Sequence, residues 1–550
     1  MKNLYNSLVK IHFLISISLV AVGILASIMF FWHLGTNPLE KWDEAIHAQV
    51  THEMVESGNW LELTWNHEPY FRKPPLRFWL SAPVVMFFGE SEFTIRFWSA
   101  TAGVLTTLLI ALWAWQAQHQ SLRSDAGQAT KKISTAWLAA LIFLSGKYLF
   151  YHAFRTGETD GLMTFTTLLA LWAYWKSWTK PRWLIVTALA LGLTFLTKFT
   201  AAGFAGITIL LHLVATRGFT KYSKKIWLQT IGIGLLVVAP WVVAQLVIRG
   251  NAFVQEYFSE DIVTRASTNL YGFEAGPGWY WDVFVKRFFP LAAFALPACV
   301  WAIGRMIAKR DSLLGLWLAF LAVTVAIVSF NASKTDWYLL PIYPVLALVM
   351  SLWVTRWFRW PLGWISLGLI AWGVVAYVRR LPSMVPDTGF THWLVPQTYL
   401  EWFNGNGGRW AMALLIAGVI ILLTIMANHR QSPKLWRSTL VALLLWIGVI
   451  AFAGQRAELR VTRSEPLLPA ARTIIQREKP NILYLKNVYL PHEPTVVFYL
   501  GNEKNTTLED VPTSISSGAY VLEKLQGGVT PLGGTPLLQS ADFQLVRYNQ

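Results

Sequence analysis

Residues 11–32 read IHFLISISLVAVGILASIMFFW and contain no Asp, Glu, Lys or Arg. An α-helix needs about 20 mainly apolar residues to cross the hydrocarbon core of a bilayer, so this run is long enough to span. Lys2 and Lys10 precede it, and no small-residue cleavage site of the A-x-A kind closes it cleanly. We therefore expect an uncleaved first transmembrane helix rather than a signal peptide.

Further apolar runs of spanning length follow along the chain. We place them at 94–116, 134–152, 161–178, 183–198, 200–216, 226–248, 289–306, 313–330, 337–355, 361–379, 410–428 and 436–454. The division between the fifth and sixth helices rests on Lys198 and its immediate neighbours. The sequence thus predicts about 13 transmembrane helices.

The charges between these runs agree with that count. With the N-terminus inside, alternate loops carry 20 Lys and Arg residues and only Asp125 and Asp311 as acids. Basic residues are retained on the cytoplasmic side of a membrane. The N-terminus is therefore expected in the cytoplasm and, with an odd number of helices, the C-terminus outside.

The overall composition also favours a membrane protein. Apolar residues make up 54% of the 550 and charged residues 14%, whereas soluble domains have about a quarter charged. The net charge of +16 falls largely in the short inner loops, so topology explains it better than nucleic-acid binding does. Cys299 is the only cysteine, which excludes an intramolecular disulfide and a cysteine-based metal site.

The character of the sequence changes after residue 454. The segment 455–550 is more polar and contains LLPAARTIIQREK, which has the pattern of an amphipathic helix. The pieces NILYLKNV, TVVFYLG, AYVLEKL and FQLVRYN have the pattern of strands. We expect an α-helical polytopic membrane domain over 1–454 and a small α/β domain over 455–550 on the outer face.

Residues suited to chemistry gather in the predicted outer loops, of which 33–93, 249–288 and 380–409 are long. Trp42-Asp43-Glu44 places two carboxylates just after the first helix, and burial near the lipid boundary would raise a carboxyl pKa and make it a better base. A helix is expected from Glu44 to Ser57, ended by Gly58. The alternative to a catalytic role is that these two acids simply begin a solvated loop.

Tyr70-Phe71-Arg72-Lys73-Pro74-Pro75 comes later in the same loop. The two prolines restrict the backbone, so the cations before them are held in place. A fixed ammonium at the membrane surface suits a phosphate, although a lipid-headgroup anchor is an equal alternative.

The other outer loops add acids and cations. They contain Arg155-Thr156-Gly157-Glu158-Thr159-Asp160; then Glu256, Glu260, Asp261 and Arg265 before the aromatic stretch 279–281; and Ser333-Lys334-Thr335-Asp336-Trp337-Tyr338, followed by LLPIYP, which includes Tyr343. Each motif is weak alone. Their convergence on one side of the bilayer predicts a site.

Other motifs that would indicate a function are incomplete or absent. HEMVE at 52–56 lacks the second His of a zinc-protease helix, and no G-x-x-x-x-G-K-[ST] phosphate loop occurs in the sequence. We assign no residue as a metal ligand. A divalent metal ion is the one cofactor that the sequence leaves open. A secondary transporter is disfavoured because most charges lie at helix ends rather than mid-membrane.

In order and combination, W-D-E-A, Y-F-R-K-P-P-L, R-T-G-E-T-D-G-L-M-T-F and S-K-T-D-W-Y-L-L-P-I-Y-P resemble the bacterial ArnT-like branch of the protein O-mannosyltransferase superfamily. These are inverting membrane glycosyltransferases of the GT-C class. The resemblance covers the whole chain. It implies transfer of a sugar, 4-amino-4-deoxy-L-arabinose in the best-known members, from undecaprenyl phosphate or a similar polyprenyl phosphate to lipid A at the periplasmic face of the inner membrane.

The resemblance implies roles for Asp43, Lys73, Asp160 and Arg265, which match the family's motifs. We expect the other site residues to join them because of their positions in the outer loops and at helix ends. The catalytic set would be Asp43, Glu44 and Asp160. The donor phosphate would be bound by Lys73, Arg72, Arg265, Lys334 and Lys198. Glu158, Tyr70, Tyr338 and Tyr343 would contact the sugar or the acceptor. We expect the chain to act as a monomer on a lipid or glycan acceptor.

The sequence departs from the family at two points. Ile46-His47 stand where Arg-Tyr is common, and Arg72 stands where Glu is common, so a metal contact from that Glu is not available. These changes leave the sugar and the acceptor open. A protein O-mannosyltransferase or another envelope-glycan transferase is the main alternative.

Overall fold

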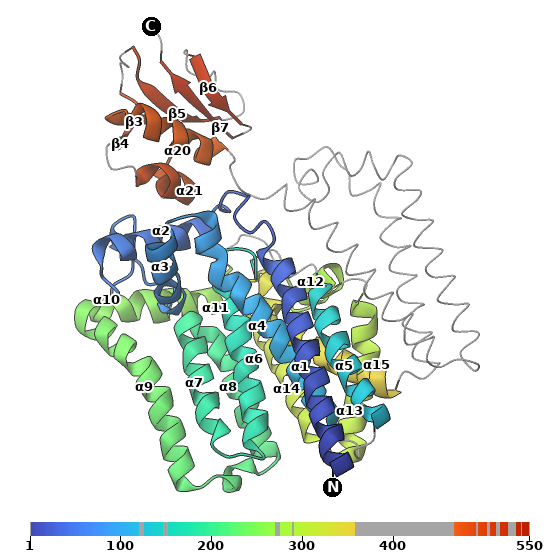
Figure 1. Ribbon diagram of the computed structural model, residues 1–550. Coiled ribbons are helices and arrows are strands. Elements are labelled where there is room, and N and C mark those ends of the chain that lie inside the picture. Colours follow the sequence, from blue (N-terminus) through green and yellow to red (C-terminus); the bar gives the residue numbers. More distant parts are fainter. Residues whose placement is uncertain are drawn as a thin grey trace, which may run out of the picture.

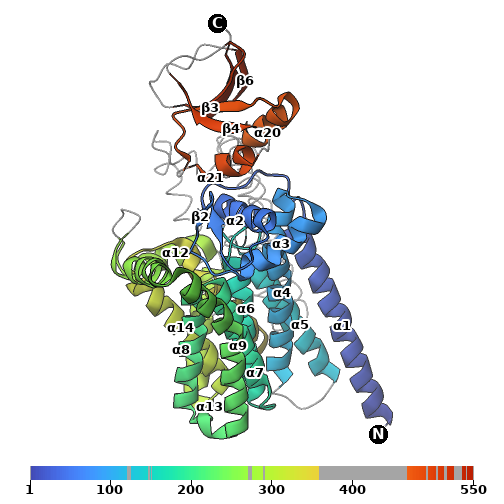
Figure 2. The same ribbon diagram turned by 90° about the vertical axis from the view of Figure 1, so that its left-hand side faces the viewer.

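The computed structural model describes residues 2–119, 126–146, 149, 152–269, 275–288, 291–357, 467–490, 493–502, 506–512, 517–525, 535–540 and 542–548. Figure 1 shows a helical bundle with the N-terminus at its lower end. A small sheet lies beyond the opposite end of the bundle and carries the C-terminus. Short helices lie between the bundle and the sheet in both views (Figures 1 and 2).

Each expected span that falls in the described ranges overlaps an α-helix. These helices are α1 (Lys2–Phe31), α4 (Glu92–His119), α5 (Ala126–Leu144), α6 (Asp160–Ser177), α7 (Trp183–Thr197), α8 (Phe199–Ala215), α9 (Lys224–Arg249), α13 (Ala292–Lys309), α14 (Ser312–Phe330) and α15 (Ile342–Trp357). Helix α5 begins and ends eight residues before the expected span 134–152. The spans 361–379, 410–428 and 436–454 lie outside the described residues. Lys198 alone separates α7 from α8, as expected.

Three of these helices are both long and apolar enough to cross a membrane by length and composition, namely those over Glu92–Gln118, Lys224–Arg249 and Ser312–Phe330. Helix α9 exposes Leu228, Leu236 and Val247 by 67–79% of their surface, which suits contact with lipid tails. The bundle core is aromatic. Trp113 and Trp317, both fully buried, meet edge to face with ring centroids 5.4 Å apart.

The segment between α1 and α4 folds back over the end of the bundle. It forms α2 (Asp43–Ser57), a two-stranded hairpin of β1 (Thr64–Trp65) and β2 (Glu68–Pro69), and α3 (Leu76–Phe88). Helix α2 agrees with the prediction, and Gly58 ends it in the left-handed conformation with φ 67°. Helix α3 has 13 residues, too few to span.

The long loop 249–288 is also helical in part. Within 249–288, the short helix α10 (Asn251–Phe253) leads into a π-helical stretch, Val254–Thr264, and then into α11 (Arg265–Ser267) and α12 (Trp279–Phe288). Arg287 of α12 forms an ion pair with Asp336, which ties this loop to the segment before α15.

The C-terminal residues form one helix and a sheet. Helix α20 (Leu467–Glu478) and strands β3 (Ile482–Lys486), β5 (Tyr520–Lys524) and β7 (Phe543–Arg547) match the expected elements. Strands β4 (Thr507–Asp510) and β6 (Thr535–Gln539) complete the order β4-β3-β5-β7-β6. Strand β3 is parallel to β4 and β5, and β7 is antiparallel to β5 and β6.

One predicted strand is wrong. TVVFYLG is helical, with α21 (Pro494–Val496) continuing as a π-helical turn over Val497–Gly501. Pro494 at the first helical position favours a helix start. Both faces of this segment are buried, so its continuous apolar run does not distinguish a helix from a strand.

Arg155 bonds the loop between α5 and α6 to the end of α1. Its guanidinium donates to the carbonyls of Met29 (2.8 Å), Phe30 (3.1 Å) and Trp32 (2.8 Å). These carbonyls belong to the last turn of α1 and the residue beyond, where partners within the helix are lacking. A cation at this end also interacts favourably with the helix dipole.

We expect Arg155→Ala to lower the free energy of unfolding by about 2 kcal/mol, because charged hydrogen bonds to helix-end carbonyls are lost. Thermal denaturation of the purified protein in detergent measures this change. Arg182→Ala, at an exposed position, is the matched control. Equal melting temperatures for the two variants would contradict the capping role.

Candidate active site

Asp43 and Lys73 lie close together although 30 positions separate them. Asp43 begins α2, and Lys73 precedes the Pro74-Pro75 pair at the start of α3. Burial alone would raise the pKa of Asp43, but the positive charge of Lys73, followed by His47, His152 and Lys198, outweighs it and holds the pKa well below its usual range. The expectation of a raised pKa at Asp43 is therefore wrong, because cations surround this carboxylate.

Glu44, the second acid of the pair, faces into the protein. It is fully buried, and its carboxylate accepts from the Arg96 guanidinium (2.7 and 2.8 Å), the Glu40 N–H (2.6 Å) and the Gly157 N–H (2.5 Å). Burial would raise the pKa of Glu44, but Arg96 and these N–H donors lower it. Both oxygens are thus occupied by protein donors.

Arg96 also holds the chain that leads to Asp43. Its guanidinium donates to the carbonyls of Leu34 (3.0 Å), Asn37 (2.8 Å) and Pro38 (2.8 Å). Sequence reasoning missed Arg96 because it lies four residues inside α4, in a run that reads as membrane helix. An arginine within an apolar run is the signal that could have identified it.

Asp160 and Lys198 form an ion pair of 2.9 Å at the same end of the bundle. Asp160 is the first residue of α6, and Lys198 lies at the break between α7 and α8. The Lys198 ammonium is also 5.0 Å from the ring centroid of Tyr338. Two helix ends and the segment before α15 therefore meet here, and the Lys198 charge contributes to the field around Asp43.

Glu158 is buried between two histidines. His47 Nδ1 lies 3.4 Å and His152 Nδ1 lies 3.6 Å from its carboxylate, and the His152 ring stacks on Trp337 at 3.9 Å. Burial, followed by the charges of Asp43, Asp160 and Glu44, raises the pKa of Glu158 well above its usual value. Burial lowers the pKa of His47 to about 3, so that ring is neutral near pH 7. Neither histidine is among the site residues predicted from the sequence.

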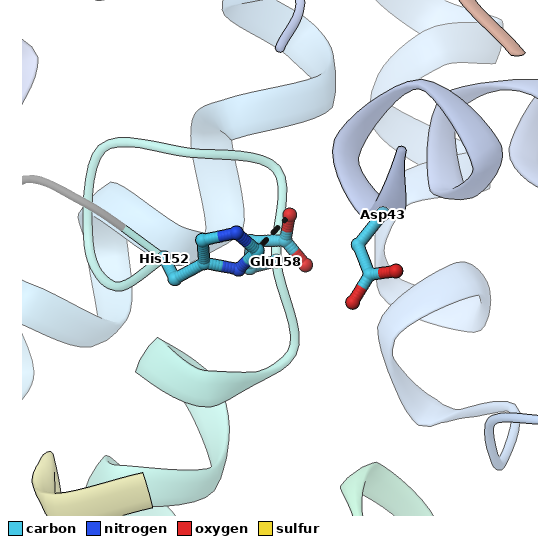
Figure 3. A group of neighbouring side chains, drawn as sticks. All are labelled: Asp43, His152 and Glu158. Atoms are coloured by element: carbon cyan, nitrogen blue, oxygen red, sulfur yellow. Dashed lines mark ion pairs between the residues drawn. The ribbon is translucent and has the colours of Figure 1, made fainter. Parts of the chain in front are cut away.

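Asp43, His152 and Glu158 are the one group in the described ranges that could supply three metal-ligand atoms, all within 4.8 Å of one another. Figure 3 shows Asp43 at the start of α2 facing the loop that carries the other two. Lys73 and Lys198 add positive charge beside Asp43, which disfavours a divalent ion at that end of the set.

The remaining predicted site residues differ in burial and in the groups that they contact. Arg72 is exposed, and Arg265 begins α11, with its side chain outside the described part. Lys334 is buried, and its ammonium donates to the Asn331 carbonyl (2.6 Å). The Tyr343 ring packs against Phe288, with centroids 5.2 Å apart, and that of Tyr70 against Phe78 at 6.3 Å. Both tyrosines are therefore largely inside the protein.

Backbone contacts bring the segments of Lys334 and Arg265 together. The Ala332 N–H donates to the Ala266 carbonyl (2.9 Å), and the Ser333 hydroxyl donates to the Thr268 carbonyl (2.6 Å). These bonds join the turn before α15 to the end of α11. The same turn carries Trp337 and Tyr338, which touch His152 and Lys198.

Residues 72–243 match the family described as dolichyl-phosphate-mannose-protein mannosyltransferase. A relative from Pseudomonas savastanoi pv. phaseolicola, named undecaprenyl phosphate-alpha-4-amino-4-deoxy-L-arabinose arabinosyl transferase, is 28% identical over 325 residues, 58% of this chain and 57% of its own. A Proteus mirabilis protein, the second arabinosyl transferase of that name, is 25% identical over 346 residues, 61% of this chain and 59% of its own. The match thus spans less than two thirds of these relatives' length.

The fold agrees with the sequence matches. The crystal structure of ArnT from Cupriavidus metallidurans bound to undecaprenyl phosphate superimposes with a TM-score of 0.70 and 16% identity, covering 96% of this chain and 97% of that one. The apo structure of the same protein gives the same values. The fold of this chain is therefore similar to that of ArnT, and its sequence is similar to those of the two arabinosyl transferases.

Proposed function

We propose that this chain transfers a sugar from undecaprenyl phosphate to an acceptor at the periplasmic face of the inner membrane. The names of its relatives favour 4-amino-4-deoxy-L-arabinose as the sugar and, with the family resemblance, lipid A as the acceptor. The observation that carries the proposal is the meeting of Asp43, Lys73, Asp160 and Lys198 at one end of an ArnT-like bundle. Incubation of the reconstituted protein with the lipid-linked sugar and lipid A tests it, by the mass of one sugar added to lipid A.

The proposed topology follows from the charge pattern. The cytoplasmic N-terminus, about 13 helices and a periplasmic C-terminus place the site on the outer side. The catalytic domain would cover 1–454, with outer loops 33–93, 249–288 and 380–409, and the α/β domain 455–550. We expect the chain to act as a monomer.

Lys73 is proposed to bind the carrier phosphate. It lies where Pro74 and Pro75 fix the backbone at the start of α3, whose N–H groups also attract anions. As the bond between sugar and phosphate breaks, charge grows on the phosphate, and a fixed ammonium stabilises it without reorganisation. Lys198, Lys334 and Arg265 would add positive charge from the neighbouring segments.

Asp43 is proposed to orient the sugar or the acceptor as a permanently ionised group. Its lowered pKa makes it a weak base. Such a carboxylate suits a nucleophile that is already ionised, as a phosphate oxygen of lipid A is. Removal of a hydroxyl proton, which a protein O-mannosyltransferase requires, would need a stronger base.

The other acids would support Asp43. Glu44 would fix the backbone of the Asp43 turn through Arg96. Asp160 would hold the Lys198 ammonium in place. Glu158, neutral and next to Asp43, would donate a hydrogen bond that an ionised carboxylate could not donate.

We expect Asp43→Asn to reduce turnover at least about 100-fold, because a neutral amide cannot replace an oriented charge. Initial rates with the purified protein measure it, and an unchanged melting temperature shows that the fold is retained. Asp282→Asn, on the exposed side of α12, is the control. Retained turnover in Asp43→Asn would remove Asp43 from the catalytic role.

We expect Lys73→Gln to raise the donor KM about tenfold, since loss of one ammonium–phosphate contact costs about 1.4 kcal/mol of binding. Arg72→Gln, at the exposed neighbour, is expected to change it less than about threefold. Saturation curves with the lipid-linked donor measure the KM of both variants. Equal effects would mean that the two cations act only as a headgroup anchor.

We expect Glu158→Gln to stay active and to abolish one pH dependence of stability. Because the native state holds a proton on Glu158, wild-type stability falls as pH rises above the ordinary Glu value of 4.5 toward the raised pKa. Gln does not titrate, so its melting temperature should exceed that of the wild type increasingly at higher pH. Parallel melting curves from pH 4 to 9, with Glu56→Gln as the exposed control, would contradict this.

A further inference from the structure

The C-terminal sheet region shares a hydrophobic core with the loop that carries Asp43. Leu39, Ala48, Val85 and Ile95 from the first loop and α4 belong to one buried cluster with C-terminal residues that include Leu468, Val496, Phe498 and Tyr499. Helix α21 lies directly above α2 in both views (Figures 1 and 2). A common core of this kind makes the C-terminal region part of the scaffold of the loop.

Tyr499 extends from this core to the backbone before Asp43. Its hydroxyl accepts from the Leu39 N–H at 2.9 Å and donates to a Glu92 carboxylate oxygen at 2.7 Å. Burial, followed by the charge of Glu92, raises the pKa of Tyr499, so the hydroxyl keeps its proton and remains a donor. Tyr499 thus links the start of the Asp43 turn to the first residue of α4.

The turn from Leu39 to Glu44 is fixed at both ends. At its far end, Glu44 is held by Arg96 and by the Gly157 N–H. Between the ends, Trp42 adopts φ 72°, a positive value that a bulky residue rarely takes unless its surroundings impose it. Asp43 follows directly, so its direction depends on both attachments.

Other contacts of the C-terminal region lie farther from the turn or are exposed. Lys41 pairs with Asp542 at 2.7 Å, but Asp542 is half exposed, so the pair contributes little. Asn502 exchanges two amide hydrogen bonds with Gln49, six residues after Asp43, at 3.0 and 2.9 Å. Among the described residues, Tyr499 is therefore the C-terminal side chain that bonds the turn backbone from a buried position.

We propose that the C-terminal region orients Asp43 for catalysis and that Tyr499 is the positioning residue through which it acts. This inference rests on the proposed function for its catalytic part only. The acid of the active site would then be held by a segment more than 450 positions away in sequence. Loss of the hydroxyl would misalign Asp43 and leave the donor phosphate site at Lys73 in place.

Tyr499→Phe tests the inference, because Phe keeps the packed ring and removes both hydrogen bonds. We expect kcat to fall about tenfold, since small misplacements of a catalytic group cost this much or more. The donor KM, the donor-binding stoichiometry and the melting temperature should stay close to those of the wild type. A loss of folded protein would instead lower the binding stoichiometry. Tyr484→Phe, in β3, is the matched control with wild-type values expected.

Amide hydrogen exchange provides a readout independent of activity. Exchange at Leu39 and Glu40 should accelerate about tenfold in Tyr499→Phe and stay unchanged in Tyr484→Phe. Unchanged exchange, or a kcat within twofold of the wild type, would overturn the positioning role. If the wild type transfers no sugar, the proposed function fails, and exchange alone decides whether Tyr499 holds the turn.

Discussion

The buried ion pair between Glu44 and Arg96 is the interaction on which the site depends. It joins α2 to α4, and through the Gly157 N–H it also joins the loop between α5 and α6. Removing two charges from water is unfavourable, so such a pair persists only when every lone pair and N–H finds a partner. Here Leu34, Asn37 and Pro38 supply carbonyls to Arg96, and Glu40 supplies an N–H to Glu44. The network converts an irregular stretch of chain into a rigid support for Asp43.

This support explains why two adjacent acids behave differently. Glu44 is neutralised by a single arginine and is shielded from solvent, whereas the pKa of Asp43 is lowered by several groups, of which Lys73 has the largest effect. The Lys73 ammonium beside Asp43 suits a site for a polyprenyl phosphate. Glu158 shows the opposite effect, because the anions around it favour its neutral form. Charge distribution, rather than residue type, therefore separates the roles of these carboxylates.

Much of this arrangement could be predicted from local patterns. The apolar runs located the helices, Gly58 marked the end of α2, and the motif order brought Asp43, Lys73, Asp160 and Lys198 into one hypothesis. Patterns could not show which partner each charge finds, because partners such as Glu44 and Arg96 are 52 positions apart. The sign of the pKa shift at Asp43 was wrong for that reason. The segment Pro494–Gly501 was predicted as a strand because a helix buried on all sides has no amphipathic period.

The two histidines beside Glu158 show how neutral side chains affect the charge of a buried acid. His47 and His152 are far apart in the chain, and sequence alone offered no reason to connect them. The structure places both rings against Glu158, one bonded to the Gly157 carbonyl and the other stacked on Trp337. A neutral His47 can occupy this position without adding a charge to the cluster, whereas an arginine there would favour the ionised form of Glu158. The residue at position 47 and the proton on Glu158 are therefore coupled, so an arginine introduced at 47 would change the charge of the acid next to Asp43.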